Sequence, residues 1–360
     1  MPASWSRRSV LGLIGAGATT AVVGCADRKG RGPHDLTGPT QTPQPRTPTE
    51  VADVPALLAA LARARELHTR TMAIQGARGG VADILAEAAA AHAEQADVLE
   101  RLLIAGGVQV PAAPPAPLPP TPTSPTSSSA PPADDARATS VSPQDRERAR
   151  VEEAERAAEQ TAEQAARAAR HARALSEVAA EDVSASALSE LAQVSGANLA
   201  MLTAITGQRG ALAELGTELD WRPLEGPTGA AAAGVLAAFR QAVYAFEVIA
   251  GKASGDERDQ FEPALSRLRN LTRQLTALAA DAAPPAPLGY GLPDLDTPAQ
   301  RRSLAGDVFA ALPPSVVAGA GAHTEDLASV TGTVRLLTES LVLGRRWGLT
   351  LQGFPGMTVP

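Results

Sequence analysis

The chain is predicted to be an all-α protein. Alanine supplies 75 of its 360 residues, whereas Phe, Tyr and Trp together supply ten. Alanine is the strongest helix former, while strands favour β-branched and aromatic residues. Long segments repeat apolar residues at spacings of three and four, which is typical of amphipathic helices. Prolines and glycines gather between these segments, so they divide the chain into helical regions and connections.

Residues 1–24 resemble a twin-arginine-type lipoprotein signal peptide. Arg7 and Arg8 precede an uncharged stretch, 10–23, which is too short to span a bilayer. The paired arginines resemble a signal for the translocase that exports folded proteins. Val22-Val23-Gly24-Cys25 resembles a lipobox, and Cys25 is the only cysteine of the chain. The alternative is an ordinary cleaved secretory signal with an incidental cysteine.

Lipidation of Cys25 would place the protein on the outer face of a bacterial cell membrane. Acyl chains are then its membrane anchor, because each buried CH₂ contributes about 0.8 kcal/mol. The whole chain has a formal charge of −7, and the part after residue 24 has −9, since Arg7 and Arg8 are removed. An acidic body is held away from an anionic bilayer. The same charge argues against nucleic acid as a partner.

Two segments have the composition of disordered connections. Residues 25–50 are rich in Gly, Pro, Thr and Gln and are predicted to be a flexible tether from the lipidated Cys25. Residues 108–141 hold ten prolines and a run of serines and threonines, so they cannot form a packed core. They are predicted to be a solvated linker, and in an exported protein such a tract is also a candidate for O-linked sugar.

The N-terminal helical region is predicted to cover residues 51–206, with the linker inside it. Apolar periodicity predicts helices over 54–74 and 81–105, joined by a Gly-rich turn into an antiparallel hairpin. A third helix, 143–180, has only an alanine seam, and a fourth, about 183–206, has a stronger apolar face. Gly207 is predicted to break that helix.

The last third, residues 229–356, is predicted to be a four-helix bundle. Its helices are expected near 230–253, 256–280, 301–320 and 325–351, with Pro313-Pro314 kinking or interrupting the third. Phe239 lies on the apolar stripe of the first of these helices and is expected to point inward.

The last third also resembles a known family. The segment 236–246, then Gly289-Tyr290-Gly291-Leu292-Pro293 and Phe354-Pro355-Gly356, is similar to the ferritin-like domain of unknown function found in exported lipoproteins of high-GC Gram-positive bacteria. The resemblance implies a ferritin-like bundle over about 229–356. Members of the family typically have Glu-His where this chain has Phe239-Arg240, so a ligand that the family's glutamate supplied would be lost here.

The sequence lacks the usual signs of a cofactor or of catalysis. A ferritin-like di-iron site needs two Glu-x-x-His motifs. The residues three positions before the five histidines are Arg31, Arg65, Ala89, Ala168 and Ala320. There is also no Gly-x-Ser-x-Gly elbow and no Walker loop. We therefore expect no cofactor, no metal and no catalytic residue.

Four residues remain as weaker candidates for a site. Arg240, Tyr244 and Glu247 share one polar helical face and could meet at helical spacing. Glu247 and Glu339 are expected to face solvent or to pair with arginine. His92 occupies a seam position, where a core histidine satisfied by a partner helix is the more ordinary interpretation than a ligand or a switch.

These features together favour a non-enzymatic binding or structural module in the cell envelope, with an unknown envelope protein as its partner. The alternative is a metal-binding or redox ferritin-like protein with an atypical site, and a third hypothesis is a small-ligand carrier. The sequence indicates no oligomeric state.

Overall fold

The computed structural model describes residues 52–112 and 142–359, which fall within one compact unit of the chain. The described residues form α-helices and short 3₁₀ turns without a β-strand, which confirms the predicted all-α class. The predicted signal and tether, with Arg7, Arg8 and Cys25, and most of the predicted linker lie outside the described residues. The helices are α3 (Val54–Met72), α4 (Gly80–Ala105), α5 (Pro143–Ala180), α6 (Ala185–Leu191), α7 (Gly196–Glu214), α8 (Gly229–Lys252), α9 (Asp256–Ala279), α10 (Pro298–Val317) and α11 (Leu327–Arg345).

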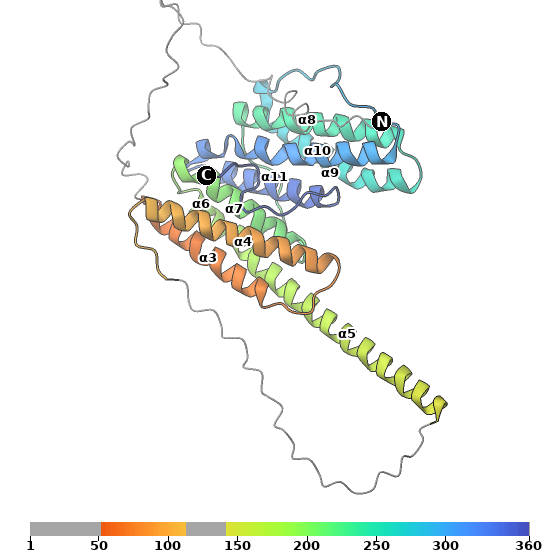
Figure 1. Ribbon diagram of the computed structural model, residues 1–360. Helices are drawn as coiled ribbons and strands as arrows, with labels where there is room; N and C mark the ends of the chain where they lie inside the picture. Colours follow the sequence, from red (N-terminus) through yellow and green to blue (C-terminus); the bar gives the residue numbers. More distant parts are fainter. Residues whose placement is uncertain (1–51, 113–141, 360) are drawn as a thin grey trace, which may run out of the picture. The chain divides into compact units, whose positions relative to one another are not determined.

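Helices α3 and α4 form the predicted hairpin (Figure 1). Pro55 stands in the first turn of α3, where its missing N–H costs no hydrogen bond. Gly79 precedes α4 with φ = +54°, a backbone conformation that side chains disfavour. Leu61 of α3 and Leu99 of α4 belong to one buried apolar cluster. The apolar seams read from the sequence are therefore the faces on which the two helices pack.

The predicted helix break at Gly207 is wrong, because α7 continues to Glu214. The two glycines inside α7 serve close packing instead. A Cβ on Gly207 would lie 2.5 Å from a methyl group of Leu337, and one on Gly210 would overlap the Thr338 hydroxyl. Leu337 and Thr338 belong to α11, so α7 packs closely on the last helix. Helix α7 also crosses residue 206, where the N-terminal region was predicted to end.

Helices α8 to α11 form a four-helix bundle, as predicted. Helix α8 packs on α9 and α10, and α10 packs on α11 (Figure 1). Helix α11 ends at Arg345 rather than near Leu351. Of the described helices, only α8 is long and apolar enough, by length and composition, to cross a membrane; its apolar stripe is buried in the bundle.

Aromatic rings fill the centre of this bundle. Phe239, Phe246, Phe261 and Phe309 are all fully buried, which confirms the inward position expected for Phe239. Phe261 stacks on Trp347, with ring centroids 4.6 Å apart and planes within 3°. Phe246 meets Phe309 edge to face at 5.2 Å, a favoured arrangement for aromatic pairs. Four phenylalanines and Trp347 therefore form one aromatic core inside the bundle.

Helix α10 continues through Pro313 and Pro314 to Val317, so the interruption expected at these prolines does not occur. Gly356 lies against this turn with φ = +81°, and a Cβ on it would come within 2.5 Å of the Pro313 carbonyl group. The C-terminal segment therefore covers the part of α10 where proline removes backbone N–H donors.

The C-terminal segment, residues 346–357, also binds α4. Glu87 accepts a hydrogen bond from the Leu351 N–H at 3.0 Å, and Glu94 accepts one from the Gly353 N–H at 3.0 Å. Phe354 is buried in the same apolar cluster as Leu61 and Leu99. Phe354-Pro355-Gly356, assigned from the sequence to the bundle, therefore also fastens the bundle to the N-terminal hairpin.

Asp53 makes a second link between distant parts of the chain. Its buried carboxylate accepts hydrogen bonds from the Ser195 N–H at 2.9 Å, from the Ser195 hydroxyl and from the Asn198 amide at 2.7 Å. Ser195 is the N-cap of α7, so a negative charge from the start of α3 lies at the positive end of another helix.

We predict that Asp53→Ala lowers the free energy of unfolding by about 3 kcal/mol. The change removes an anion that accepts three hydrogen bonds, and bonds to charged groups contribute about 1.5–3 kcal/mol each without full additivity. Urea unfolding followed by circular dichroism measures the effect. Asp294→Ala, at an exposed loop position, is the control and is expected to change stability by less than about 0.5 kcal/mol. Equal losses in the two variants would contradict the role of Asp53.

Candidate functional site

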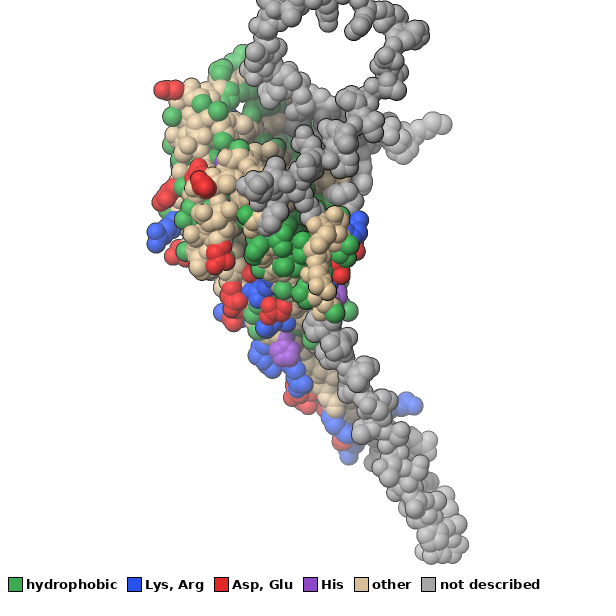
Figure 2. Space-filling model, turned by 90° about the vertical axis from the view of Figure 1, so that its left-hand side faces the viewer, with side chains coloured by type: hydrophobic (Ala, Val, Ile, Leu, Met, Phe, Trp, Pro, Cys, Tyr) green, Lys and Arg blue, Asp and Glu red, His purple; other side chains and the backbone are tan. Residues whose placement is uncertain are grey.

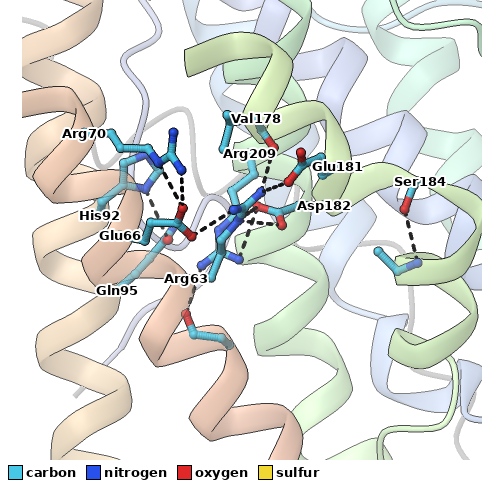
Figure 3. A network of polar contacts seen from close by, with 12 residues as sticks. Arg63, Glu66, Arg70, His92, Gln95, Val178, Glu181, Asp182, Ser184 and Arg209 are labelled. Carbon is cyan, nitrogen blue, oxygen red and sulfur yellow. Dashed lines mark hydrogen bonds and ion pairs between the residues drawn. The ribbon is translucent and has the colours of Figure 1, made fainter. Parts of the chain in front are cut away.

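Among the described residues, a connected group of buried charges lies where α3, α7 and the end of α5 meet (Figure 3). Arg209 of α7 is 5% exposed. It donates to the Ala60 carbonyl of α3 at 3.1 Å and pairs with Asp182 at 3.5 Å. Asp182 belongs to the 3₁₀ turn Glu181–Val183, directly after α5. One guanidinium therefore touches two other elements.

Arg63 of α3 binds the same carboxylate. Its Nε donates to Asp182 at 3.0 Å, and its terminal nitrogens donate to Glu66 at 2.9 Å, Glu181 at 2.9 Å and the Val178 carbonyl at 2.7 Å. Figure 3 shows the two arginines converging on Asp182. We call Arg63, Asp182 and Arg209 the arginine joint.

Burial is the largest influence on the pKa values of Arg209 and Asp182, the two most enclosed members of the arginine joint. It lowers the pKa of Arg209 to about 10, against the opposing effect of Asp182. It also raises the pKa of Asp182, although Arg209 and Arg63 act in the opposite direction. Loss of hydration thus outweighs attraction for each ion, and each needs the other to remain charged inside the protein.

A neutral polar group lies beside the arginine joint. His92 of α4 is fully buried, as expected, but the nearest hydrogen-bonding atom of its Nδ1 is Gln95 Oε1 on the same helix, at 3.5 Å. From the sequence, another helix is expected to supply the hydrogen-bond partner of His92. For Nδ1 this expectation is wrong, because Gln95 belongs to α4 as well. Gln95 in turn donates to Gln208 of α7 at 3.0 Å and to the Gly353 carbonyl at 2.9 Å. Burial, followed by the charge of Arg209, lowers the pKa of His92 to about 3.

The other three candidates from the sequence do not join His92, which lies on a different helix. Arg240 donates to the Pro284 carbonyl, and the ring of Tyr244 lies 5.4 Å from that of Tyr290. Glu247 accepts hydrogen bonds from Arg269 of α9 at 2.7 and 3.0 Å. Arg240 and Tyr244 thus hold the connection between α9 and α10, whereas Glu247 bridges α8 and α9.

A second group of buried charges surrounds Glu339 of α11. Glu339 is 3% exposed and pairs with Arg335 at 2.7 Å and with Arg267 of α9, which confirms the expected pairing with arginine for both Glu339 and Glu247. Glu214, at the end of α7, lies close enough to interact electrostatically with Glu339 and Arg267. Burial raises the pKa of Glu214, the charge of Glu339 raises it further, and Arg267 opposes both.

A surface hollow of about 450 Å³ opens next to this second group. It is lined by Glu218, Leu219, Asp220, Trp221 and Arg267. The Trp221 indole lowers the pKa of Glu214, yet the indole nitrogen and Glu214 Oε2 both lack a partner at hydrogen-bonding geometry. The hollow therefore has a mixed polar and aromatic wall.

The donor set does not fit the di-iron centre that a ferritin-like bundle implies. Among the residues that the structure describes, no three His, Cys, Asp or Glu side chains lie close enough together to hold a metal ion. The carboxylate groups of Glu339 and Glu247 already pair with arginines, and a guanidinium at that position repels a cation. These carboxylates are placed to bind neighbouring helices.

The arginine joint was missed in the sequence. A signal for it does exist: Gln208-Arg209 stands between two glycines inside an otherwise apolar helix, and Glu181-Asp182 follows α5 directly. The pairing itself joins residues 119 positions apart, which no local pattern reveals.

Comparison of this chain with protein-family models, with curated proteins and with solved structures gives no match.

We predict that Asp182→Asn lowers the free energy of unfolding by about 3 kcal/mol, because it leaves Arg209 buried without its anion. Replacing both partners, in Asp182→Leu with Arg209→Met, is expected to restore most of the loss, since apolar side chains need no hydration. Urea unfolding of Asp182→Asn measures the first effect. The cycle of wild type, Asp182→Leu, Arg209→Met and the double variant measures the second.

Glu177→Gln is the matched control for Asp182→Asn. Glu177 is exposed and pairs with Arg173 one helical turn away at 3.5 Å, so its removal is expected to change stability by less than about 0.5 kcal/mol. An Asp182→Asn protein as stable as this control would show that the arginine joint does not hold the helices together.

We also predict that His92 weakens the fold in acid. Its ordinary pKa is 6.5 and its pKa in the folded chain is about 3, so between these values the unfolded chain takes up a proton that the folded chain refuses. The contribution of His92 therefore falls by about 1.4 kcal/mol for each pH unit in this window. Urea unfolding between pH 6 and pH 4 should show a smaller loss of stability in His92→Gln than in the wild type. Parallel curves for the two proteins would contradict the prediction.

Proposed function

We propose that this protein is a lipid-anchored, non-enzymatic binding module of the bacterial cell envelope, with a degenerate ferritin-like domain. Export by the twin-arginine route and anchorage through Cys25 are part of the proposal, and the sequence of residues 1–25 supports them. The partner is a protein of the envelope.

The observation that carries the proposal is the exposed first half of α5. Every side chain whose burial is described between Gln144 and Gln160 is exposed, and full burial begins only at Ala168. We call residues 144–160 the arm. At 1.5 Å per residue the arm is about 25 Å long. It projects beyond the hairpin in Figure 1.

The composition of the arm suits contact with another protein. Figure 2 shows acidic and basic side chains lying next to one another along α5. Arg156 pairs with Glu152 one turn away at 3.5 Å, which supports a helix that has little tertiary packing. Val151 is 49% exposed and lies among these charges. The arm has exposed side chains and contributes little to the core, so the extra length that it gives to α5 is better explained by an external contact.

The pairing of carboxylates with arginines supports a non-enzymatic role. Asp182, Glu339 and Glu247 are each paired with at least one arginine that belongs to a different helix. Such groups hold helices together and are not poised to attack or protonate a substrate.

A photo-crosslinking amino acid at position 155, in the arm, tests the proposal in native cells that express the full chain. We expect one discrete crosslinked envelope protein from this position. The control position is 262, where Glu262 of α9 is also exposed and pairs with Arg258 within its own helix. It should give no such product.

Cys25→Ser is combined with the same crosslinker to test the anchor. The variant is expected to leave the membrane fraction and to lose most of the crosslinked product, because the lipid concentrates the chain at the membrane. Equal products from positions 155 and 262, or turnover of a substrate by the purified protein, would overturn the proposed function. A Cys25→Ser protein that resists a salt wash would overturn the lipid anchor.

A further inference from the structure

Two buried side chains between α4 and α7 each leave one nitrogen without a partner. His92 and Gln208 are both fully buried, and the unpartnered atoms are His92 Nε2 and Gln208 Nε2. The Nε atom of the adjacent Arg209 is a third. Gln95 reaches both His92 and Gln208, so the three side chains form one cluster. A buried polar group without a partner loses its hydration without compensation, so three such groups together are costly.

The hydrogen bonds of Gln95 determine which atoms of His92 and Gln208 donate and which accept. Its Nε2 lies 2.9 Å from the Gly353 carbonyl and 3.0 Å from Gln208 Oε1. A carbonyl oxygen only accepts, so both amide hydrogens of Gln95 are used. The remaining Gln95 atom, Oε1, is therefore an acceptor, and His92 Nδ1 opposite it carries the ring proton.

The unpartnered atoms consequently differ in kind. A neutral imidazole has one N–H, and His92 is neutral because its burial disfavours the charged form. Its Nε2 is then a lone-pair acceptor. Gln208 Oε1 already accepts from Gln95, so its free group is the donating amide. Arg209 Nε–H is also a donor. The cluster thus presents one acceptor and two donors.

A small neutral molecule that both donates and accepts satisfies both kinds of atom. An anion would accept from Gln208 and Arg209 but would be repelled by the lone pair of His92. A cation would bind that lone pair but would meet the charge of Arg209, which acts strongly enough on His92 to lower its pKa. Water both donates and accepts, and buried waters usually have two to four polar partners.

We propose that α4 and α7 enclose a bound water site, at which water donates to His92 Nε2 and accepts from the Gln208 amide. The site would join the hairpin to α7 beside the point where Gln95 binds the C-terminal segment. It assigns His92 to a structural water and not to a metal or a proton-transfer step.

Nuclear magnetic resonance of the lipid-free chain from residue 26 to 360 tests the site. We expect the ring proton of His92 on Nδ1 and long-lived water contacts to the Gln208 side-chain amide protons. Gln208→Met, which removes the donor and fills its space, should lose those contacts. A ring proton on Nε2, the absence of long-lived water at Gln208 in the wild type, or its persistence in Gln208→Met would each overturn the proposal.

A high-resolution crystal structure of the same chain, soaked in bromide, separates water from an ion. Density within hydrogen-bonding distance of His92 Nε2 and Gln208 Nε2 and without anomalous signal is the expected result. An anomalous peak there would identify an anion site and overturn the water assignment. The wild-type measurements decide the matter even if Gln208→Met does not fold.

Discussion

Burial of the Arg209 guanidinium is the constraint on which the surrounding structure depends. A buried cation must have an anion and hydrogen-bond acceptors nearby. Asp182 supplies the anion from the turn after α5, and Ala60 supplies a carbonyl from α3. Arg63 then shares the same carboxylate. The positions of α3, α5 and α7 are therefore tied to one another by charge, in a region where the α5 seam is mostly alanine and buries little apolar surface.

Helix α11 is held against α7 by close packing. Gly207 and Gly210 let the backbone of α7 approach Leu337 and Thr338, and the Thr338 hydroxyl donates to the Gly207 carbonyl at 3.2 Å. Larger residues at either glycine would separate the helices. Helix α7 thus uses charge on one side and close packing on the other, which explains why a short polar run stands inside an apolar helix.

Much of the helical content could be predicted from the sequence, because apolar spacing of three and four reports directly on buried faces. The α3–α4 hairpin, the inward Phe239 and the buried His92 all follow from that local signal. The predicted helix break at Gly207 was wrong. Glycine occurs both at helix ends and where two helices pack closely, and only the contact with Leu337 shows that Gly207 belongs to the second kind. The arginine joint could not be predicted because its members are distant in the sequence, and the same holds for the Gln95 bond to Gly353. The ferritin-like resemblance remains a prediction.

The hydrogen bonds between the C-terminal segment and α4 affect the order in which the protein folds. Gln95 meets Gly353 across 258 positions of the chain. The hairpin is synthesised early and its helices can pair at once, because their contacts are local. The polar groups of α4 that bind Leu351 and Gly353, however, have no partner there until those residues have left the ribosome. The contact between Gln95 and Gly353 therefore forms only after residue 353 has been synthesised, however early the helices of the hairpin have paired.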